Sequence, residues 1–218
     1  MLRTSLYRGI PRSLFHASTR LSSSQHDLGW ICEKTIQIPN STTELGVCKF
    51  RMGHLSESSV LGKAGNTMVH VALNSKTPDA EPKEDFLPLT VDYRSRSYAF
   101  GILPPLPKRR ERHGDDEEIL AARVIDRAIR PLFPKGYTDE VQLTVTAHAI
   151  DNINDPTILA VNAASAALYN SKQPWNGPIG CVRIGYIDGN LTVNPPLADM
   201  KRSTLDLLYA GTSERTLM

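Results

Sequence analysis

The sequence predicts an α+β protein, because segments with the two-residue period of half-buried strands alternate with two segments that have the period of a helix. The strand pattern places apolar side chains on one face over Thr67–Leu73, Leu87–Arg94 and Val141–Ala149. The helical segments are Asp116–Arg130 and Ile158–Tyr169.

The first helical segment has a defined start and end. Asp115 can cap its first turn, and Glu118, three residues later, completes the pattern of a capping box. Pro131 ends the helix after Arg130, because proline lacks the backbone N–H that a further turn needs. We expect the buried stripe of this helix to consist of Leu120, Val124, Ile125, Ala128 and Ile129.

The second helical segment and the strands after it complete the prediction. Asp155 is in the N-cap position and Pro156 in the first position of the helix. The many alanines that follow predict close packing against a sheet rather than a place on the surface. Further strands are expected over residues 180–187, 191–193 and 204–210, with a hairpin turn at Asp188-Gly189.

The overall charge gives little reason to expect a non-specific nucleic-acid binder. The chain of 218 residues has 25 Lys and Arg against 23 Asp and Glu, a net charge of +2. No apolar run approaches the roughly 18 residues that span a bilayer, so we expect no membrane partner. Three cysteines without a C-x-x-C pair predict no metal or redox site. Any basic binding site must therefore be local.

The first 26 residues differ in composition from the rest of the chain. They contain four arginines, eight Ser or Thr and no acidic residue, which is typical of a mitochondrial transit peptide. We therefore predict that residues 1–28 are a mitochondrial transit peptide, and the alternative is a disordered basic tail. Without the four arginines, 21 basic residues stand against 23 acidic ones, so the remaining chain is slightly acidic.

Two groups of basic residues stand out in this nearly neutral chain. One lies in the segment Pro104–Arg112, just before the first helix, and the other follows one face of that helix at the spacing i, i+4, i+7. Both are candidates for phosphate binding, because guanidinium groups make bidentate contacts with phosphate oxygens. The alternative for the helix is a solvated face with intrahelical pairs such as Asp126 with Arg130. The candidate residues are Lys108, Arg109, Arg110, Arg123, Arg127 and Arg130.

Five sequence blocks carry a resemblance to a known family. They lie in order between about Gly53 and Met218 and read PLTVDYRSRSYAFG, LAARVIDRAIRPLFPKGY, NDPTILAVNAASAAL, PWNGPIGCVRIGYIDGNLTVNP and LDLLYAGT. With these blocks the chain resembles the first RNase PH-type repeat of the polynucleotide phosphorylase family, and the leader indicates a mitochondrial member. The resemblance implies an α+β fold of the β-α-β-α type, a mixed sheet with packed helices. It assigns residues 40–178 to the N-terminal part of the first RNase PH-like domain and residues 179–218 to the start of a C-terminal subdomain, which we expect to be incomplete.

The resemblance implies that the whole protein is an enzyme, a 3′-to-5′ exoribonuclease that uses inorganic phosphate to release nucleoside diphosphates from single-stranded RNA. Members of the family form a ring-shaped homotrimer. Their catalytic acids, magnesium ligands and phosphate-holding serines belong mainly to a second repeat, so we expect no catalytic or metal-binding residue in this chain. Magnesium and inorganic phosphate are expected in the whole enzyme, with their ligands elsewhere.

The first repeat of this family contributes a basic loop that faces the RNA channel, and the resemblance maps that loop onto Arg109 and Arg110. Pro107 and Lys108 stand where family loops carry aromatic residues, so we expect the grip to rest on phosphate contacts rather than on base stacking. The segment Gly53–Thr67 is also shorter than its family counterpart. Two alternatives stay open: a non-catalytic RNA-binding or structural ring subunit of an exosome-like complex, and a structural fragment without RNA affinity.

Overall fold

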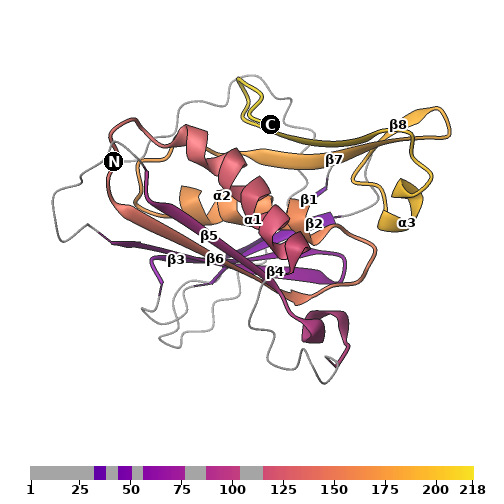
Figure 1. Cartoon of the computed structure of the whole chain (residues 1–218), viewed down its shortest axis with the longest axis horizontal. Coiled ribbons are helices and arrows are strands. Elements are labelled where there is room, and N and C mark those ends of the chain that lie inside the picture. The colour runs from indigo at the N-terminus through magenta and orange to yellow at the C-terminus, as the bar shows by residue number, and fades with distance from the viewer. Residues whose placement is uncertain (1–31, 38–43, 51–55, 77–86, 104–114) are drawn as a thin grey trace.

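The computed structural model describes residues 32–37, 44–50, 56–76, 87–103 and 115–218, and it shows an α+β fold with two sheets (Figure 1). The predicted transit peptide, residues 1–28, lies outside the described residues. The elements in chain order are β1 Cys32–Gln37, β2 Glu44–Phe50, β3 Ser58–Ala64, β4 Thr67–Lys76, β5 Leu89–Ser95, η2 Ser97–Phe100, α1 Asp116–Ile129, η4 Arg130–Leu132, β6 Glu140–Ala149, α2 Pro156–Tyr169, β7 Gly180–Ile187, β8 Asn190–Val193, α3 Leu197–Met200 and β9 Asp206–Gly211.

The larger sheet is mixed, as the family resemblance predicted. Its six strands are ordered β1-β2-β3-β4-β6-β5. All neighbours are antiparallel except β5 and β6, which run parallel. A parallel pair needs a crossover connection, and α1 provides it between these two strands. The crossover places the helix that carries Arg123 and Arg127 directly beside the edge of the sheet.

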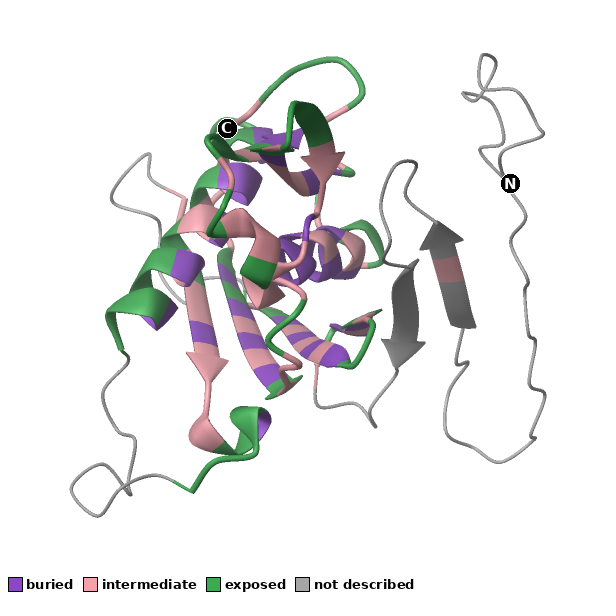
Figure 2. Cartoon of the chain, turned by 90° about the vertical axis from the view of Figure 1, so that its right-hand side faces the viewer, coloured by how far each residue is buried: buried purple, intermediate pink, exposed green. Residues whose placement is uncertain are grey.

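The core lies between the larger sheet and the two long helices. Every second residue of β4 and β6 faces the helices, which appears as alternating bands of buried residues along the strands (Figure 2). A side-chain carbon added at Gly62 of β3 would lie 3.1 Å from Leu159 of α2, so the alanine-rich helix packs closely on the sheet, as predicted. The fully buried residues of β4 and β6 are Val69, Val71, Leu73, Val141, Leu143, Val145 and Ala147.

The smaller sheet, of order β8-β7-β9, lies on the other side of α2 (Figure 1). Asn162 of α2 exchanges two hydrogen bonds of 2.9 Å with the backbone of Cys181, near the start of β7. Asp188 and Gly189 have φ angles of 50° and 85°, the left-handed conformation that a tight hairpin turn requires. The predicted turn is therefore confirmed.

Arg183 of β7 connects the smaller sheet to the start of α2. Its guanidinium lies 2.6 Å from the carboxylate of Asp155, whose other oxygen accepts the N–H of Thr157 as a helix cap. On the other side it contacts Asp206 of β9 at 2.7 Å. Hydrogen bonding to Asp206, and the nearby charge of Asp155, raise the pKa of Arg183 although burial opposes this. The three residues hold the smaller sheet against the helix layer.

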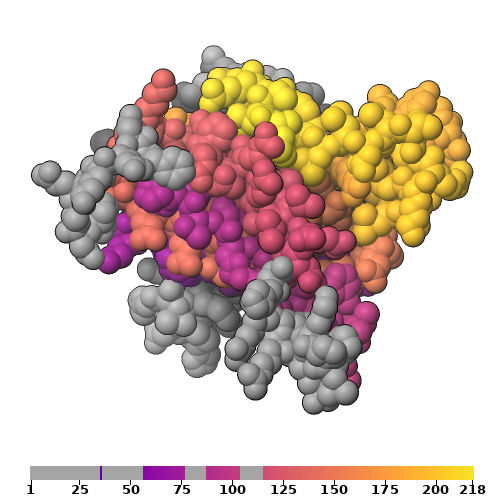
Figure 3. Space-filling model, viewed as in Figure 1, coloured from indigo at the N-terminus to yellow at the C-terminus, as the bar shows by residue number. Residues whose placement is uncertain are grey.

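The outer face of the smaller sheet is apolar and partly exposed. The strand register places Val193 and Leu207 opposite Ile184, so all three side chains share this face. Figure 3 shows this C-terminal part of the chain, in orange and yellow, projecting beside the body of the molecule. The exposed apolar residues of these strands and their connections are Tyr186, Leu191, Leu205, Leu207 and Tyr209.

Candidate nucleic-acid interface

Helix α1 begins as predicted, but two residues of its predicted buried stripe are not buried: Val124 is half-buried and Leu120 is exposed. The N–H of Asp115 donates to the carboxylate of Glu118 at 3.2 Å, within a complete capping box. Leu120 is 58% exposed. Because α1 packs on the edge strand β5, only the helix face toward that strand is buried, and Leu120 lies outside this face. The residues buried on that face are Glu118, Ala121, Ile125, Ala128 and Ile129.

Glu118 makes contacts that a capping pattern does not predict. Its carboxylate also accepts the N–H of Ser95, at the end of β5, at 2.6 Å. The guanidinium of Arg94 lies 3.9 Å away. A carboxylate can be buried only when its oxygens are paired in this way. Glu118 therefore ties the first turn of α1 to the end of the edge strand.

The basic segment before α1 lies outside the described residues, so Lys108, Arg109 and Arg110 have no structural description. The described residues at both of its ends are exposed: Leu103, at 91%, precedes it and Asp115 follows it. The contacts of Glu118 hold the second of these ends against the sheet.

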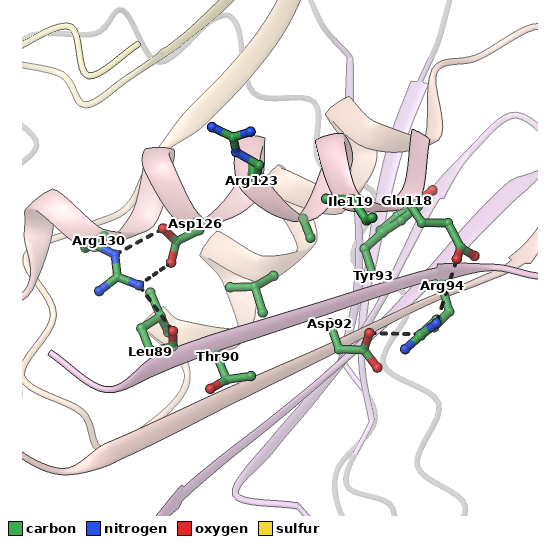
Figure 4. Close-up of a pocket in the computed structure, with 12 residues that line it drawn as sticks. Leu89, Thr90, Asp92, Tyr93, Arg94, Glu118, Ile119, Arg123, Asp126 and Arg130 are labelled. Atoms are coloured by element: carbon green, nitrogen blue, oxygen red, sulfur yellow. Dashed lines mark hydrogen bonds and ion pairs between the residues drawn. The ribbon is translucent and has the colours of Figure 1, made fainter. Parts of the chain in front are cut away.

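Arg123 and Arg127 are the exposed arginines of the predicted helix face. Neither makes a hydrogen bond or an ion pair with another described residue of the chain. In Figure 4 the guanidinium of Arg123 points away from β5. Both guanidinium groups can therefore bind phosphate oxygens without giving up a contact inside the described fold.

Arg130, the third arginine of that face, has a different environment. Its guanidinium donates to both carboxylate oxygens of Asp126, at 3.0 and 2.7 Å. It also donates to the carbonyl oxygens of Leu87, at 2.9 Å, and Leu89, at 3.2 Å. The intrahelical pair with Asp126 is confirmed. Arg130 joins the end of α1 to the start of β5, which favours a structural interpretation for this residue.

A groove of about 490 Å³ lies between β5 and α1 (Figure 4). Arg94 contacts Asp92 at 2.8 Å on its floor, and Arg130 contacts Asp126 at one end. Positive and negative side chains are equal in number, so the groove itself has no excess charge that would attract a polyanion. Its charged lining residues are Arg94, Arg123, Arg130, Asp92, Glu118 and Asp126.

Asp151 is a structural centre that sequence reasoning did not identify. Its carboxylate accepts hydrogen bonds from Thr67 Oγ1 at 2.9 Å and from the backbone N–H groups of Ile153 and Asn154 at 2.8 and 2.9 Å. Burial acts to raise the pKa of Asp151, but these donors outweigh it and lower the pKa to about 2. The residue joins the β3–β4 turn to the loop that leads into α2.

A second polar cluster lies on the face of the larger sheet opposite the helices. Ser59 Oγ and His70 Nε2 are 2.7 Å apart, and the ring of His148 lies 5.7 Å from the ring of His70. Burial, together with the nearby charge of His148, lowers the pKa of His70. In the described part of the chain no group of three or more His, Cys, Asp or Glu residues could hold a metal ion.

The mixed sheet, with α1 as the crossover between its two parallel strands, defines an RNase PH-like fold. The chain can be superimposed on the crystal structure of rice (Oryza sativa) Rrp46 with a TM-score of 0.65, covering 84% of this chain and 81% of that one at 13% identity. Residues 46–174 match the family model described as the 3′ exoribonuclease family, domain 1. The chain belongs to this family.

Curated relatives are much longer than this chain. A polyribonucleotide nucleotidyltransferase of Roseiflexus sp. (strain RS-1) is 47% identical over 169 residues, which cover 77% of this chain and 22% of the relative. That of Phenylobacterium zucineum (strain HLK1) is 44% identical over 189 residues, covering 86% and 26%. Polyribonucleotide nucleotidyltransferase 2, mitochondrial, of Oryza sativa subsp. japonica is 42% identical over 174 residues, covering 77% and 18%. The chain thus spans about a fifth to a quarter of their lengths.

Proposed function

We propose that this chain is the RNA-gripping first repeat of a mitochondrial polyribonucleotide nucleotidyltransferase. The identity of 47% over 169 residues to an enzyme of that name carries the proposal. In the proposed reaction an oxygen of inorganic phosphate attacks the phosphorus of the last phosphodiester bond. The 3′ oxygen of the preceding nucleotide leaves, so a nucleoside diphosphate is released and the RNA becomes one nucleotide shorter. The same step in reverse extends the RNA.

Within this enzyme the chain holds RNA by its phosphates. A processive exonuclease must bind features that every nucleotide shares, which are the backbone phosphates and the faces of the bases. Arg123 and Arg127 supply exposed guanidinium groups with no partner in the described fold. Arg109 and Arg110, which precede the helix in the sequence, are two further arginines proposed to contact phosphates. Assembly as a homotrimer brings three copies of these arginines to one channel, which explains how a nearly neutral chain binds a polyanion.

Arg130 has a supporting role in this proposal. It fixes α1 to β5 and so orients the helix face that carries Arg123 and Arg127. We assign no catalytic or metal-binding residue to the chain. Magnesium and inorganic phosphate act in the whole enzyme, and their ligands lie outside residues 1–218. In this proposal residues 40–178 are the N-terminal part of the first RNase PH-like domain, and residues 179–218 are the start of its C-terminal subdomain.

Mitochondrial targeting is supported by the basic, acid-free leader and by the mitochondrial relative from rice. Residues 1–28 fused to a fluorescent protein are expected to direct it to mitochondria. The matched control replaces the four arginines of the leader with glutamine and is expected to stay in the cytosol. If both fusions reach the same compartment, the leader is a basic tail rather than a transit peptide.

RNA binding by the chain tests the proposed role. The affinity for a fluorescent poly(A) oligomer is measured at increasing salt concentrations, for the chain and for the variant with Arg109→Ala and Arg110→Ala. Each phosphate contact contributes about 0.7 to the slope of log K against log salt for single strands, so the double variant is expected to have a slope that is shallower by about 1.4. An unchanged slope contradicts the assignment of these two arginines.

Catalysis by the purified chain is a separate question. Incubated with poly(A), phosphate and magnesium, the chain alone is expected to release no ADP, because we place the catalytic acids elsewhere. Release of ADP that depends on phosphate would overturn that assignment. The alternative, a non-catalytic ring subunit of an exosome-like complex, shares the fold, but the 13% identity to Rrp46 supports the fold alone.

A further inference from the structure

Strand β5 forms one edge of the larger sheet. It is the last strand in the order β1-β2-β3-β4-β6-β5, and its neighbour is β6. The backbone groups on its other side are therefore not used by the sheet. An edge of this kind can accept a further strand from another chain.

The hydrogen bonds of β5 show which of its residues direct their backbone groups outward. The carbonyl oxygen of Pro88 accepts the N–H of Val141, so Pro88 faces β6. Because successive residues of a parallel strand alternate in direction, Leu89, Val91, Tyr93 and Ser95 face away from β6. The contacts of Arg130 with the carbonyl of Leu89, and of Glu118 with the N–H of Ser95, agree with this direction.

Side chains of α1 cover both ends of this edge and leave its centre open. Arg130 covers the carbonyl groups at the start of β5, and Glu118 covers the last N–H. Between them, the outward N–H and C=O groups of Val91 and Tyr93 have no hydrogen-bond partner among the described residues. These two N–H and two C=O groups are enough to form backbone hydrogen bonds with a short added β-strand.

Helix α1 forms an apolar wall above this open centre. Ile119 and Ala122 line the groove together with Val91, and Figure 4 shows Ile119 on α1, above β5. Ile119 is 54% exposed although it lies next to the sheet. A strand paired with Val91 and Tyr93 would place every second side chain under Ile119 and Ala122. The balanced charge of the groove favours an uncharged side chain at that position and disfavours a nucleic acid.

We propose that the open centre of β5 binds an extended peptide segment of a partner protein, which adds a strand to the larger sheet. The peptide pairs its backbone with Val91 and Tyr93 and places apolar side chains at alternate positions against Ile119 and Ala122. Arg123 also lines the groove, but its guanidinium points away from β5 (Figure 4), and Arg127 does not line the groove, so peptide binding does not require RNA.

Two substitutions act on this site. Val91→Pro removes an outward N–H and leaves the inward hydrogen bonds to β6 in place, because proline is tolerated at strand edges. Ile119→Asp places a charge in the apolar wall. The matched control is Leu120→Asp, because Leu120 is 58% exposed on the same helix and does not line the groove. Ile119→Asp also keeps the test valid if Val91→Pro does not fold.

The test uses a phage-displayed library of random nine-residue peptides, selected against the full chain. Enriched peptides are expected to have apolar residues at alternate positions. Their affinity is expected to fall at least tenfold in Val91→Pro and Ile119→Asp and to stay within twofold in Leu120→Asp. Hydrogen exchange is the structural readout: a bound peptide is expected to slow exchange at the N–H groups of Val91 and Tyr93.

Four results would overturn the proposal. In the first, the selection enriches no peptide. In the second, the enriched peptides bind the three variants with equal affinity. In the third, the N–H groups of Val91 and Tyr93 exchange at the same rate with and without peptide. In the fourth result, exchange at Val91 and Tyr93 slows as the concentration of the chain rises without peptide, which assigns the edge to a second copy of this chain. Poly(A) binding measured in parallel is expected to be equal in Ile119→Asp and Leu120→Asp, so loss of peptide binding is distinguished from loss of RNA binding.

Discussion

Replacing Arg130 with alanine separates a structural arginine from the arginines proposed to bind RNA. The substitution removes two hydrogen bonds to Asp126 and one each to the carbonyl groups of Leu87 and Leu89. The pair with Asp126 contributes about 0.4 kcal/mol, the usual value for charges spaced i, i+4 on a helix. Hydrogen bonds from a charged donor contribute about 1.5 kcal/mol or more when buried. Because the Arg130 side chain is 30% exposed, water replaces part of each bond, and we take about 0.8 kcal/mol for each carbonyl.

The expected loss of unfolding free energy for Arg130→Ala is therefore about 2 kcal/mol. Arg127→Ala is the matched control on the same helix and is expected to change this free energy by less than about 0.5 kcal/mol, because its side chain is exposed. Urea unfolding reports the difference through the fluorescence of Trp175, whose indole N–H donates to the carbonyl of Ile129 at 3.2 Å. Equal unfolding free energies for the two variants would refute the structural role of Arg130.

Three further predictions concern stability and association. The pKa of His70 is lowered in the folded chain, so the unfolded chain binds more protons near the ordinary value of 6.5, and the unfolding free energy is expected to fall as the pH drops through 6.5. The fall is expected to be less steep in His70→Gln, and an equal dependence of the unfolding free energy on pH in the two proteins contradicts this. The pKa of Asp151 is lowered from 3.8 to about 2, so its contribution to the unfolding free energy is present above pH 3.8 and is lost as the pH falls toward 2. Asp151→Asn is expected to lower the unfolding free energy by about 1 kcal/mol at pH 7 after allowance for solvent screening, and a calorimetric scan that shows no loss of stability contradicts this. Leu191→Lys combined with Leu207→Lys is expected to raise the protein concentration at which light scattering by the chain begins, because exposed apolar sheet faces associate; unchanged scattering shows that this face does not drive association.

Local patterns predicted most of the fold that surrounds the site. The period of two placed the buried faces of β4 and β6, and capping residues placed the starts of α1 and α2. The short helix α3 was not predicted, because four residues are too few to show a period. The error at Leu120 has a different cause. Apolar residues of α1 cover a wider arc than its contact face, and only the position of β5 decides which of them are buried.

Contacts between distant segments could not be predicted from the sequence. The spacing i, i+4 predicted the pair of Arg130 with Asp126. It contained no sign that the same guanidinium also binds carbonyl groups more than 40 residues earlier in the chain. Arg123 and Arg130 are both arginines and lie on the same helix face. The proximity of β5 gives only Arg130 a set of contacts inside the described fold, and this explains why we propose different roles for the two residues.

The measurement that tests the central claim most directly is the salt dependence of RNA binding by the α1 variants. The slope of log K against log salt for poly(A) is compared among the unsubstituted chain, the variant with Arg123→Ala and Arg127→Ala, and the control with Leu120→Ala. If this helix face binds RNA phosphates, the arginine variant has a slope that is shallower by about 1.4, at about 0.7 for each contact with a single strand, and the control is unchanged. If the slopes of all three proteins are equal, α1 does not contact RNA and its arginines are a solvated surface.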